Sequence, residues 1–248
     1  MKQQYVGDIN DYRKYALLRL LAEGGTLKLG ICWMLTPEDG RSDGKKTEYL
    51  NAPHQWRSYD PLLFGLLRTA VDAPAGNRLT FIETSGIIPD AVYFNELVPD
   101  DIIGRSGYIG RALRTLCEAD VLFLDPDNGL DVRTKPKGAI RSSKYVYRDE
   151  VSLIYGFGCS LVIYQHFPHQ KRAEFIEQLS LELRVLCPDA SVSTVTTSHV
   201  AFFVVAQPAH AEVVASRLSA AEQRLPPKAQ LILPQGDGSA RPAQSCGS

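Results

Sequence analysis

The feature that most constrains this chain is an apolar run that ends at a proline. Residues 121–124 read Val-Leu-Phe-Leu, and the sequence DPDNG follows at residues 125–129. A continuous apolar run of this length is typical of a strand buried on both faces of a parallel sheet. Pro126 has no N–H to donate to a sheet, so the strand is expected to end before it. Two carboxylates, Asp125 and Asp127, therefore follow the carboxyl end of a buried strand.

This position favours a ligand site. In open α/β sheets, ligands bind in the crevice at the carboxyl ends of the strands. Asp125, Asp127 and Asn128 are therefore candidate catalytic residues. The alternative is an ordinary exit from a strand, in which Asp127 and Asn128 serve only the tight turn that their residue types favour.

Segments typical of strands and helices alternate along most of the chain. The expected strands are residues 28–35, 79–83, 98–103, 121–124 and 160–164. The expected helices are residues 8–23, a segment starting at Asp60, and residues 107–118, 148–155, 168–183 and 208–224. Two β-rich runs, 191–197 and 199–206, predict an antiparallel hairpin. This order predicts an α/β fold with a doubly wound, mostly parallel, Rossmann-like sheet closed by a C-terminal antiparallel hairpin.

Composition bounds the organisation and the partners. Residues 1–225 are expected to form a single α/β domain. Residues 226–248 are expected to form a flexible tail, because Pro, Gly, Gln, Ser and Ala dominate there. The net charge of −1 means that RNA or DNA would have to bind to a local basic patch. Apolar runs are too short for a membrane span. Five scattered cysteines without C-x-x-C spacing indicate reduced thiols and a cytoplasmic protein.

A doubly wound sheet would gather the exits of several strands at one edge. The groups delivered there would be residues 36–43, Glu83, Asp125 with Asp127 and Asn128, and residues 164–166 (YQH). Glu83 is a candidate acceptor for ribose hydroxyls, or else a solvated strand end. His166 is a candidate general base or metal ligand, or else a histidine hydrogen-bonded to the backbone. No HxH or HxxxH pair accompanies His166, so no zinc site is expected.

Phosphate-binding glycine motifs are absent from the loop after the first expected strand. Residues 39–44 hold two glycines four positions apart, without the GxGxxG or GxxxxGK[ST] pattern. The most basic stretch, residues 135–148, contains five Lys or Arg residues interleaved with Tyr145 and Tyr147. Such a stretch suits phosphate tracking and base stacking, and the alternative is a solvated loop.

The order of these features resembles that of the bacterial 23S ribosomal RNA adenine-amino methyltransferases, which have the class I S-adenosylmethionine-dependent methyltransferase fold. Residues 5–15 (YVGDINDYRKY) are similar to the family signature H-A-G-N-x-x-D-V-x-K-H at Gly7, Asp11 and Lys14. Residues 125–128 (DPDN) stand where the family has D-P-P-Y, and residues 163–165 stand where it has W-Y-P. The resemblance covers about residues 4–224 in order, with few identities.

The resemblance implies S-adenosylmethionine as the cofactor, with Lys14 near its carboxylate and Glu83 on its ribose. It also implies that Asp125 accepts a hydrogen bond from the target amine, with RNA or DNA as the partner. The candidate catalytic residues are Asp125, Asp127, Asn128 and Tyr164. The candidate cofactor-binding residues are Lys14, Asp43, Glu83 and Ser106. The candidate substrate-binding residues are Tyr5, Lys144 and His166.

The chain departs from the family where an extruded base would stack. The family's second proline and its aromatic residue are replaced by Asp127 and Asn128, which removes the stacking surface. Tyr5 or Tyr164 is the candidate replacement.

Two further functions fit the same residues. Asp125, Asp127, Asp131 and Glu83 are oxygen donors of the kind that bind Mg²⁺, which would give a nuclease-like phosphodiester or phosphoryl enzyme. A catalytically silent relative that binds a nucleotide would fit the first loop, which lacks a phosphate-binding motif, and the missing aromatic residue.

Overall fold

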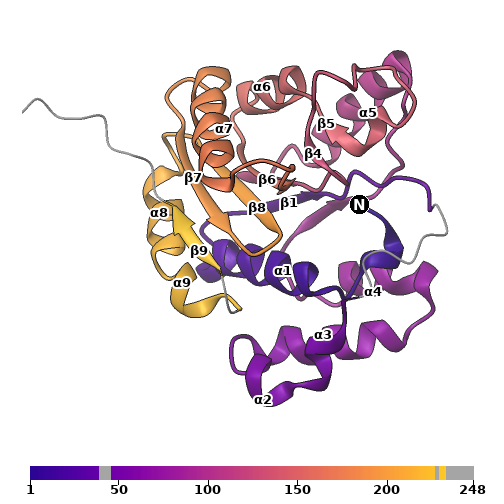
Figure 1. The fold of residues 1–248 in the computed structure, drawn as a ribbon, viewed down its shortest axis with the longest axis vertical. Coiled ribbons are helices and arrows are strands. Elements are labelled where there is room, and N and C mark those ends of the chain that lie inside the picture. Colours follow the sequence, from indigo (N-terminus) through magenta and orange to yellow (C-terminus); the bar gives the residue numbers. More distant parts are fainter. Residues whose placement is uncertain (39–45, 227–228, 233–248) are drawn as a thin grey trace, which may run out of the picture.

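A computed structural model describes residues 1–38, 46–226 and 229–232 of the chain. Within these ranges the centre is a seven-stranded sheet with the order β2-β1-β3-β6-β8-β7-β9 (Figure 1). Four neighbouring strands are parallel: β2 (Val92–Phe94), β1 (Leu29–Cys32), β3 (Val121–Leu124) and β6 (Ser160–His166). The other three are antiparallel to their neighbours: β8 (Val200–Ala206), β7 (Ser191–Thr196) and β9 (Gln230–Ile232). β8 is antiparallel to β6 and β7 is antiparallel to β8, so β7 points in the same direction as the four parallel strands. Most strands of the sheet therefore share one direction, and the expected α/β class is confirmed.

Helices cover both faces of the sheet (Figure 1). One core cluster lies under α1 (Ile9–Ala22), α3 (Pro61–Asp72), α4 (Arg78–Thr84) and α8 (Ala211–Ser219). The core on the opposite face lies under α5 (Ile102–Thr115), α6 (Arg148–Gly156) and α7 (Arg172–Leu186). The smaller elements are η1 (Gln3–Tyr5), η2 (Glu23–Gly25), η3 (Glu48–Asn51), α2 (Pro53–Trp56), η4 (Ala75–Asn77), β4 (Gly129–Leu130), η5 (Ser142–Lys144), β5 (Tyr145–Val146) and α9 (Ala221–Arg224).

The helices expected to begin at residue 8, with Asp8 or Asn10 as the cap, and at Asp60 are confirmed. The Asp8 side chain accepts a hydrogen bond from the Asn10 N–H at 2.8 Å and caps α1. The Asp60 side chain accepts one from the Leu63 N–H at 3.0 Å, with Pro61 in the first position of α3. These caps orient the first turn of each helix, and in α1 that turn carries Asp11.

Several expected elements are wrong. Residues 79–83 lie in α4 because Leu79 and Ile82 face the core at helical spacing, and the strand beside β1 is β2 instead. Residues 98–103 form a loop and the start of α5, not a strand. Residues 230–232 were expected in a flexible tail, yet they pair with β7 as β9.

The path of the chain creates a switch point in the sheet. From β1 it passes through α3 and α4 on one face to β2, and then through α5 on the other face to β3. Since β2 and β3 lie on opposite sides of β1, the strand order reverses at the carboxyl ends of β1 and β3. Ligands of open α/β sheets bind at such switch points.

Candidate functional site

We use the name strand-exit site for residues 33–36, 125–128 and 164–166, which follow or end β1, β3 and β6. The register pairs the last residues of β1 and β3 with each other and with Ile163 of β6. The next residue of each strand is therefore Trp33, Asp125 or Tyr164, and these three lie in one row across the sheet. Trp33 and Tyr164 belong to the core on the α1 side. The row is therefore positioned to meet side chains from α1.

Lys14 of α1 lies over this row and is 3% exposed. Its ammonium nitrogen is 2.7 Å from Asp125 Oδ2 and 2.8 Å from Asp11 Oδ1. It is also 5.2 Å from the centre of the Tyr164 ring and 5.9 Å from that of Trp33. Lys14 is thus a buried cation shared by two carboxylates and surrounded by aromatic rings.

Burial governs the titration of this cluster. It raises the pKa of Asp11 to about 6, because the Lys14 charge only partly offsets the loss of solvent and the charge of Asp125 adds to it. Burial also disfavours the charged form of Lys14, but Asp11 and Asp125 together hold the pKa of Lys14 above its usual value. Lys14 therefore keeps its proton and acts as a fixed positive charge.

Asp127 is buried beside this cluster and has its own partners. Its Oδ1 atom is 2.9 Å from the α-amino nitrogen of Met1, and its Oδ2 atom accepts a hydrogen bond from Thr36 Oγ1 at 2.8 Å. Lys144 Nζ lies 3.5 Å from Oδ2. Burial disfavours the carboxylate, but the amine, Thr36 and Lys144 together hold the pKa of Asp127 below its usual value. Asp127 is therefore ionised.

Three oxygen atoms converge on the Met1 amine. Besides its contact with Asp127, this amine donates hydrogen bonds of 2.9 Å to the carbonyl oxygens of Met34 and Asp125. Both carbonyls belong to the segments that leave β1 and β3. The strand-exit site thus contains a set of acceptors that holds an ammonium group.

Tyr164, His166 and Asn128 also meet at this edge. The Tyr164 ring is buried and packs edge-on against the His166 ring, with 5.1 Å between the ring centres. Burial raises the pKa of Tyr164 well above its usual value, so its hydroxyl keeps its proton. The backbone N–H of His166 donates to the backbone carbonyl oxygen of Asn128 at 3.2 Å. The structure therefore brings together the four expected catalytic residues.

Other expected site residues lie apart or have different partners. Glu83 lies on α4, where its Oε1 atom accepts hydrogen bonds from Trp33 Nε1 at 2.9 Å and Asn95 Nδ2 at 3.1 Å. Ser106 is exposed on α5, which packs on the face opposite to α1. Tyr5 lies in η1, where its ring centre is 5.7 Å from Lys2 Nζ. Asp43 lies outside the described residues.

The basic stretch 135–148 is largely neutralised by acidic neighbours. Lys137 pairs with Asp149 at 2.6 Å, and Arg148 pairs with Asp131 at 2.8 Å. Lys144 is directed into the strand-exit site, toward Asp127. The stretch therefore does not present the row of exposed cations that phosphate tracking needs.

The four carboxylates expected to bind Mg²⁺ do not converge. Asp131 faces Arg148, and Glu83 accepts from Trp33. In the ranges that the structure covers, no three His, Cys, Asp or Glu side chains are grouped so that they could hold a metal ion. The Mg²⁺ site is thus a prediction that the geometry does not support.

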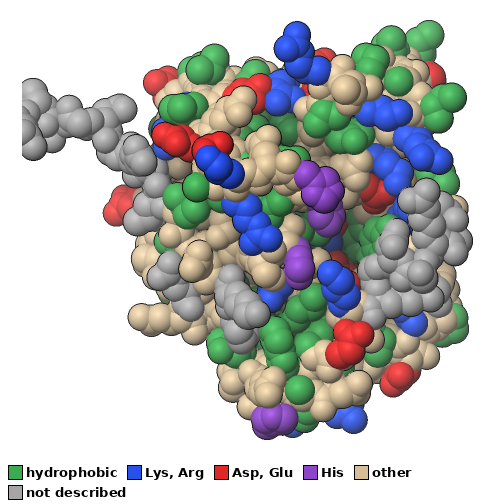
Figure 2. Space-filling model, viewed as in Figure 1, with side chains coloured by type: hydrophobic (Ala, Val, Ile, Leu, Met, Phe, Trp, Pro, Cys, Tyr) green, Lys and Arg blue, Asp and Glu red, His purple; other side chains and the backbone are tan. Residues whose placement is uncertain are grey.

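Exposed basic side chains lie around the strand-exit site, and we call them the cationic rim: Lys46, Arg172, His199 and His166, the last of which also belongs to the site. All four are exposed, and Figure 2 shows Lys, Arg and His side chains gathered around a hollow on this face. The rim is joined to the strand-exit site because His166 pairs with Val200, next to His199. Partial burial and the nearby charges of Lys46, Arg13 and Arg172 lower the pKa of His199. Burial likewise lowers the pKa of His166, so both histidines favour the neutral form and the charges of the rim are those of Lys46 and Arg172.

Sequence reasoning missed Trp33 as part of the site, placed Gln165 at the edge without giving it a role, and used Asp11 only as a match to the family signature. Asp11 had a usable signal, because it lies one helical turn before Lys14. Trp33 had none, because it lies inside the expected strand 28–35 and not after it. The contacts of Gln165 depend on the loop after β3 and have no signal in the sequence.

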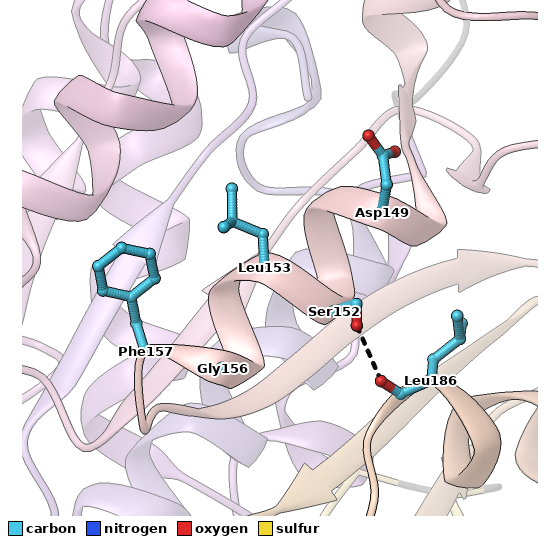
Figure 3. Close-up of a pocket in the computed structure, with 6 residues that line it drawn as sticks. All are labelled: Asp149, Ser152, Leu153, Gly156, Phe157 and Leu186. Atoms are coloured by element: carbon cyan, nitrogen blue, oxygen red, sulfur yellow. Dashed lines mark hydrogen bonds between the residues drawn. The ribbon is translucent and has the colours of Figure 1, made fainter.

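A groove elsewhere on the surface is separate from this site. It lies between α6 and the end of α7 (Figure 3), where Leu153 is 48% and Phe157 is 66% exposed. Ser152 Oγ donates to the Leu186 carbonyl oxygen at 3.0 Å across its floor. None of the residues that line it is an expected site residue.

Within the described ranges, no helix is both long and apolar enough to cross a membrane.

The chain has a weak structural neighbour among proteins of known structure. No family model and no curated protein sequence matches the chain. The crystal structure of protein LPL1258 of the DUF519 family, from Legionella pneumophila, aligns over 94% of this chain and 98% of its own. The two chains are 10% identical, and the TM-score is 0.45. This similarity is too low to transfer a family or a function.

Proposed function

We propose that this protein is an S-adenosylmethionine-dependent methyltransferase-like enzyme, with a Rossmann-like sheet, that acts on an amine of nucleic acid or of a nucleobase-like substrate. The observation that carries the proposal is the meeting of Asp125, Asp127 and Tyr164 at the switch point between β1 and β3. A fixed cation, Lys14, supports this arrangement from α1.

The acceptors around the Met1 amine fit one end of the cofactor. S-adenosylmethionine carries an ammonium group, and the Asp127 carboxylate with the carbonyl oxygens of Met34 and Asp125 already holds such a group. These residues would hold the amino-acid end of the cofactor, in competition with the Met1 amine. When bound, the cofactor supplies an activated methyl group.

The roles that the resemblance gives to Lys14 and Glu83 are not supported by their contacts. Lys14 already neutralises two carboxylates, so it is not available to a cofactor carboxylate. Glu83 already accepts hydrogen bonds from Trp33 and Asn95.

The chain's own residues would position a target amine. Lys14 binds Oδ2 of Asp125, which leaves Oδ1 as the oxygen that would accept a hydrogen bond from a substrate amine. Tyr164, next in the same row, keeps its hydroxyl proton, and its buried ring would form one wall of the site. Methyl transfer to an amine requires mainly the alignment of two reacting atoms, and such positioning needs no strong acid or base.

The cationic rim supports a substrate with phosphate groups. Lys46 and Arg172 supply the positive charge of the rim around the strand-exit site, where a nucleic acid strand would pass. Contacts of Lys and Arg with phosphates supply most of the sequence-independent affinity of nucleic-acid-binding proteins.

Isothermal titration with S-adenosylmethionine and with its demethylated product, S-adenosylhomocysteine, tests the proposal. We expect saturable binding by the wild type, and binding about tenfold or more weaker in Asp127→Asn, because the negative charge that strengthens the hydrogen bond to the ammonium group is removed. The matched control is Asp131→Asn, whose partner is Arg148 rather than the strand-exit site. Absence of binding to the wild type at millimolar concentrations, or equal effects of the two variants, would contradict the proposal.

A further inference from the structure

Gln165 ties the end of β6 to the loop that follows β3. Its side chain is buried, and Oε1 accepts a hydrogen bond from the Leu130 N–H at 2.8 Å. Its Nε2 group donates to the carbonyl oxygens of His166 at 2.8 Å and Asn128 at 3.3 Å. One carboxamide thus holds the loop at two points, on either side of Gly129.

Gly129 allows this close approach. Its φ angle is +114°, and a Cβ atom at this position would lie 2.3 Å from Gln165 Oε1 and 2.4 Å from Cδ. A side chain here would meet both a strained backbone and the carboxamide. The glycine and the glutamine therefore form one packing unit.

The loop that Gln165 holds carries the acceptor of the ammonium group. Asp127 lies two residues before Gly129, and its carboxylate is buried between the Met1 amine and Thr36. On its other side, the loop is held by the Asn128 N–H, which donates to the Lys144 carbonyl oxygen at 2.9 Å. A shift of the loop toward or away from β6 would therefore move the Asp127 carboxylate relative to β1.

We propose that Gln165 is a positioning residue of the strand-exit site, which sets the place of the Asp127 carboxylate for a ligand that carries an ammonium group. The choice of ligand rests on the proposed function. The contacts that carry the positioning are the hydrogen bonds of the Gln165 carboxamide to Leu130 and Asn128 and its packing on Gly129.

The two methionines of the chain provide a readout that needs no ligand. The Met1 sulfur lies 3.9 Å from Lys14 Nζ at the strand-exit site. The Met34 side chain instead packs in the core of the opposite face, which also contains Leu130, the residue that Gln165 holds. Labelling with [methyl-¹³C]methionine therefore reports on this site in an NMR spectrum. We expect Gln165→Leu, which keeps the bulk but removes the three hydrogen bonds, to shift the methyl signals of both residues.

The matched control is Gln207→Leu. Gln207 also donates its carboxamide to two carbonyl oxygens, those of Tyr155 at 2.7 Å and Cys159 at 3.4 Å, but before the start of β6 rather than at its end. This variant should leave both methyl signals in place. It separates the positioning of Asp127 from a general loosening of the fold.

The second readout is the dissociation constant of S-adenosylhomocysteine. Gln165→Leu should raise it about 10- to 100-fold, because small displacements of positioning groups have effects of this size, whereas Gln207→Leu should not change it. If Gln165→Leu does not fold, Gln165→Glu keeps the shape and the acceptor for Leu130, but it places a carboxylate oxygen against the carbonyl oxygens of Asn128 and His166, and it should change the same two readouts.

Unchanged methionine signals in a folded Gln165 variant would overturn the proposal. Changes of equal size in the Gln207 control would also overturn it. If the wild type binds neither adenosyl compound, the proposed function fails, and the methionine signals alone decide whether Gln165 positions the loop.

Discussion

The ammonium group of Lys14 lies 2.7 Å from Asp125 Oδ2, although 111 positions separate the two residues in the chain. Both side chains are almost fully buried, and Asp11 is the second carboxylate on the same nitrogen. The ion pair joins α1 to the exit of β3. Removing one member of a buried ion pair leaves an uncompensated charge, which costs far more than the loss of an exposed pair.

Lys14→Met should therefore destabilise the protein strongly. We expect the free energy of unfolding to fall by about 3–5 kcal/mol, because Asp11 and Asp125 would stay buried without their cation. Urea denaturation measures this change. The control is Lys28→Met, which removes an exposed lysine 3.5 Å from Glu118 and should cost less than about 1 kcal/mol. Similar losses in the two variants would contradict the role of Lys14 as a buried counter-charge.

Asp11 should make stability depend on pH in a defined window. Burial raises its pKa from 3.8 to about 6, so between these values the folded state binds the proton more tightly than the unfolded state. The contribution of Asp11 to stability therefore falls as the pH rises from about 4 to about 6, and it is constant above that range.

Asp11→Asn removes this titration. The free energy of unfolding of the variant minus that of the wild type should increase from pH 4 to pH 6 and then level off, as measured by urea denaturation at each pH. Parallel pH profiles of the two proteins would show that Asp11 does not titrate in this window.

Glu83 is expected to stabilise the fold rather than to bind the cofactor. Trp33 is 0% exposed, and Glu83→Ala removes the acceptor of its indole N–H. The free energy of unfolding should therefore fall by about 1–3 kcal/mol. Glu83→Gln keeps an acceptor oxygen and should stay close to the wild type. Denaturation followed by tryptophan fluorescence measures both, and titration with S-adenosylhomocysteine gives the affinity. A large loss of affinity in a stable Glu83→Gln protein would restore the ribose-binding role.

The elements that were predicted correctly are those whose signal is local. The apolar run 121–124 before a proline, and the helices capped by Asp8 and Asp60, agree with the structure because each depends on neighbouring residues alone. The segment 79–83 was misassigned because a short apolar run fits a buried helix turn as well as a strand. The true strand β2 has three residues and is partly exposed, which leaves almost no pattern.

The same limit applies to the candidate site. Asp125, Asp127 and Tyr164 could be predicted together, because the exits of neighbouring parallel strands meet at one edge. The partners of the charged residues could not be predicted, since they come from distant segments. Arg148, expected to contact phosphates, pairs with Asp131, and Lys14, expected at the cofactor, pairs with Asp125.

The cationic rim should supply the salt-dependent part of nucleic-acid binding. The double variant Lys46→Glu/Arg172→Glu reverses two exposed charges beside the strand-exit site. The control, Lys28→Glu, reverses an exposed charge just before β1, at the amino end of that strand and so away from the strand-exit site. Fluorescence anisotropy with a single-stranded RNA and a DNA of the same sequence gives the affinities. We expect the double variant to bind about tenfold or more weakly, and its logarithmic salt dependence to be shallower by roughly 0.7 for each phosphate that the protein no longer neutralises. The Lys28 control should keep the wild-type slope. If the double variant keeps the wild-type affinity and slope for both strands, nucleic acid does not cross this face, and the amine that the strand-exit site serves belongs to a substrate without a phosphate backbone.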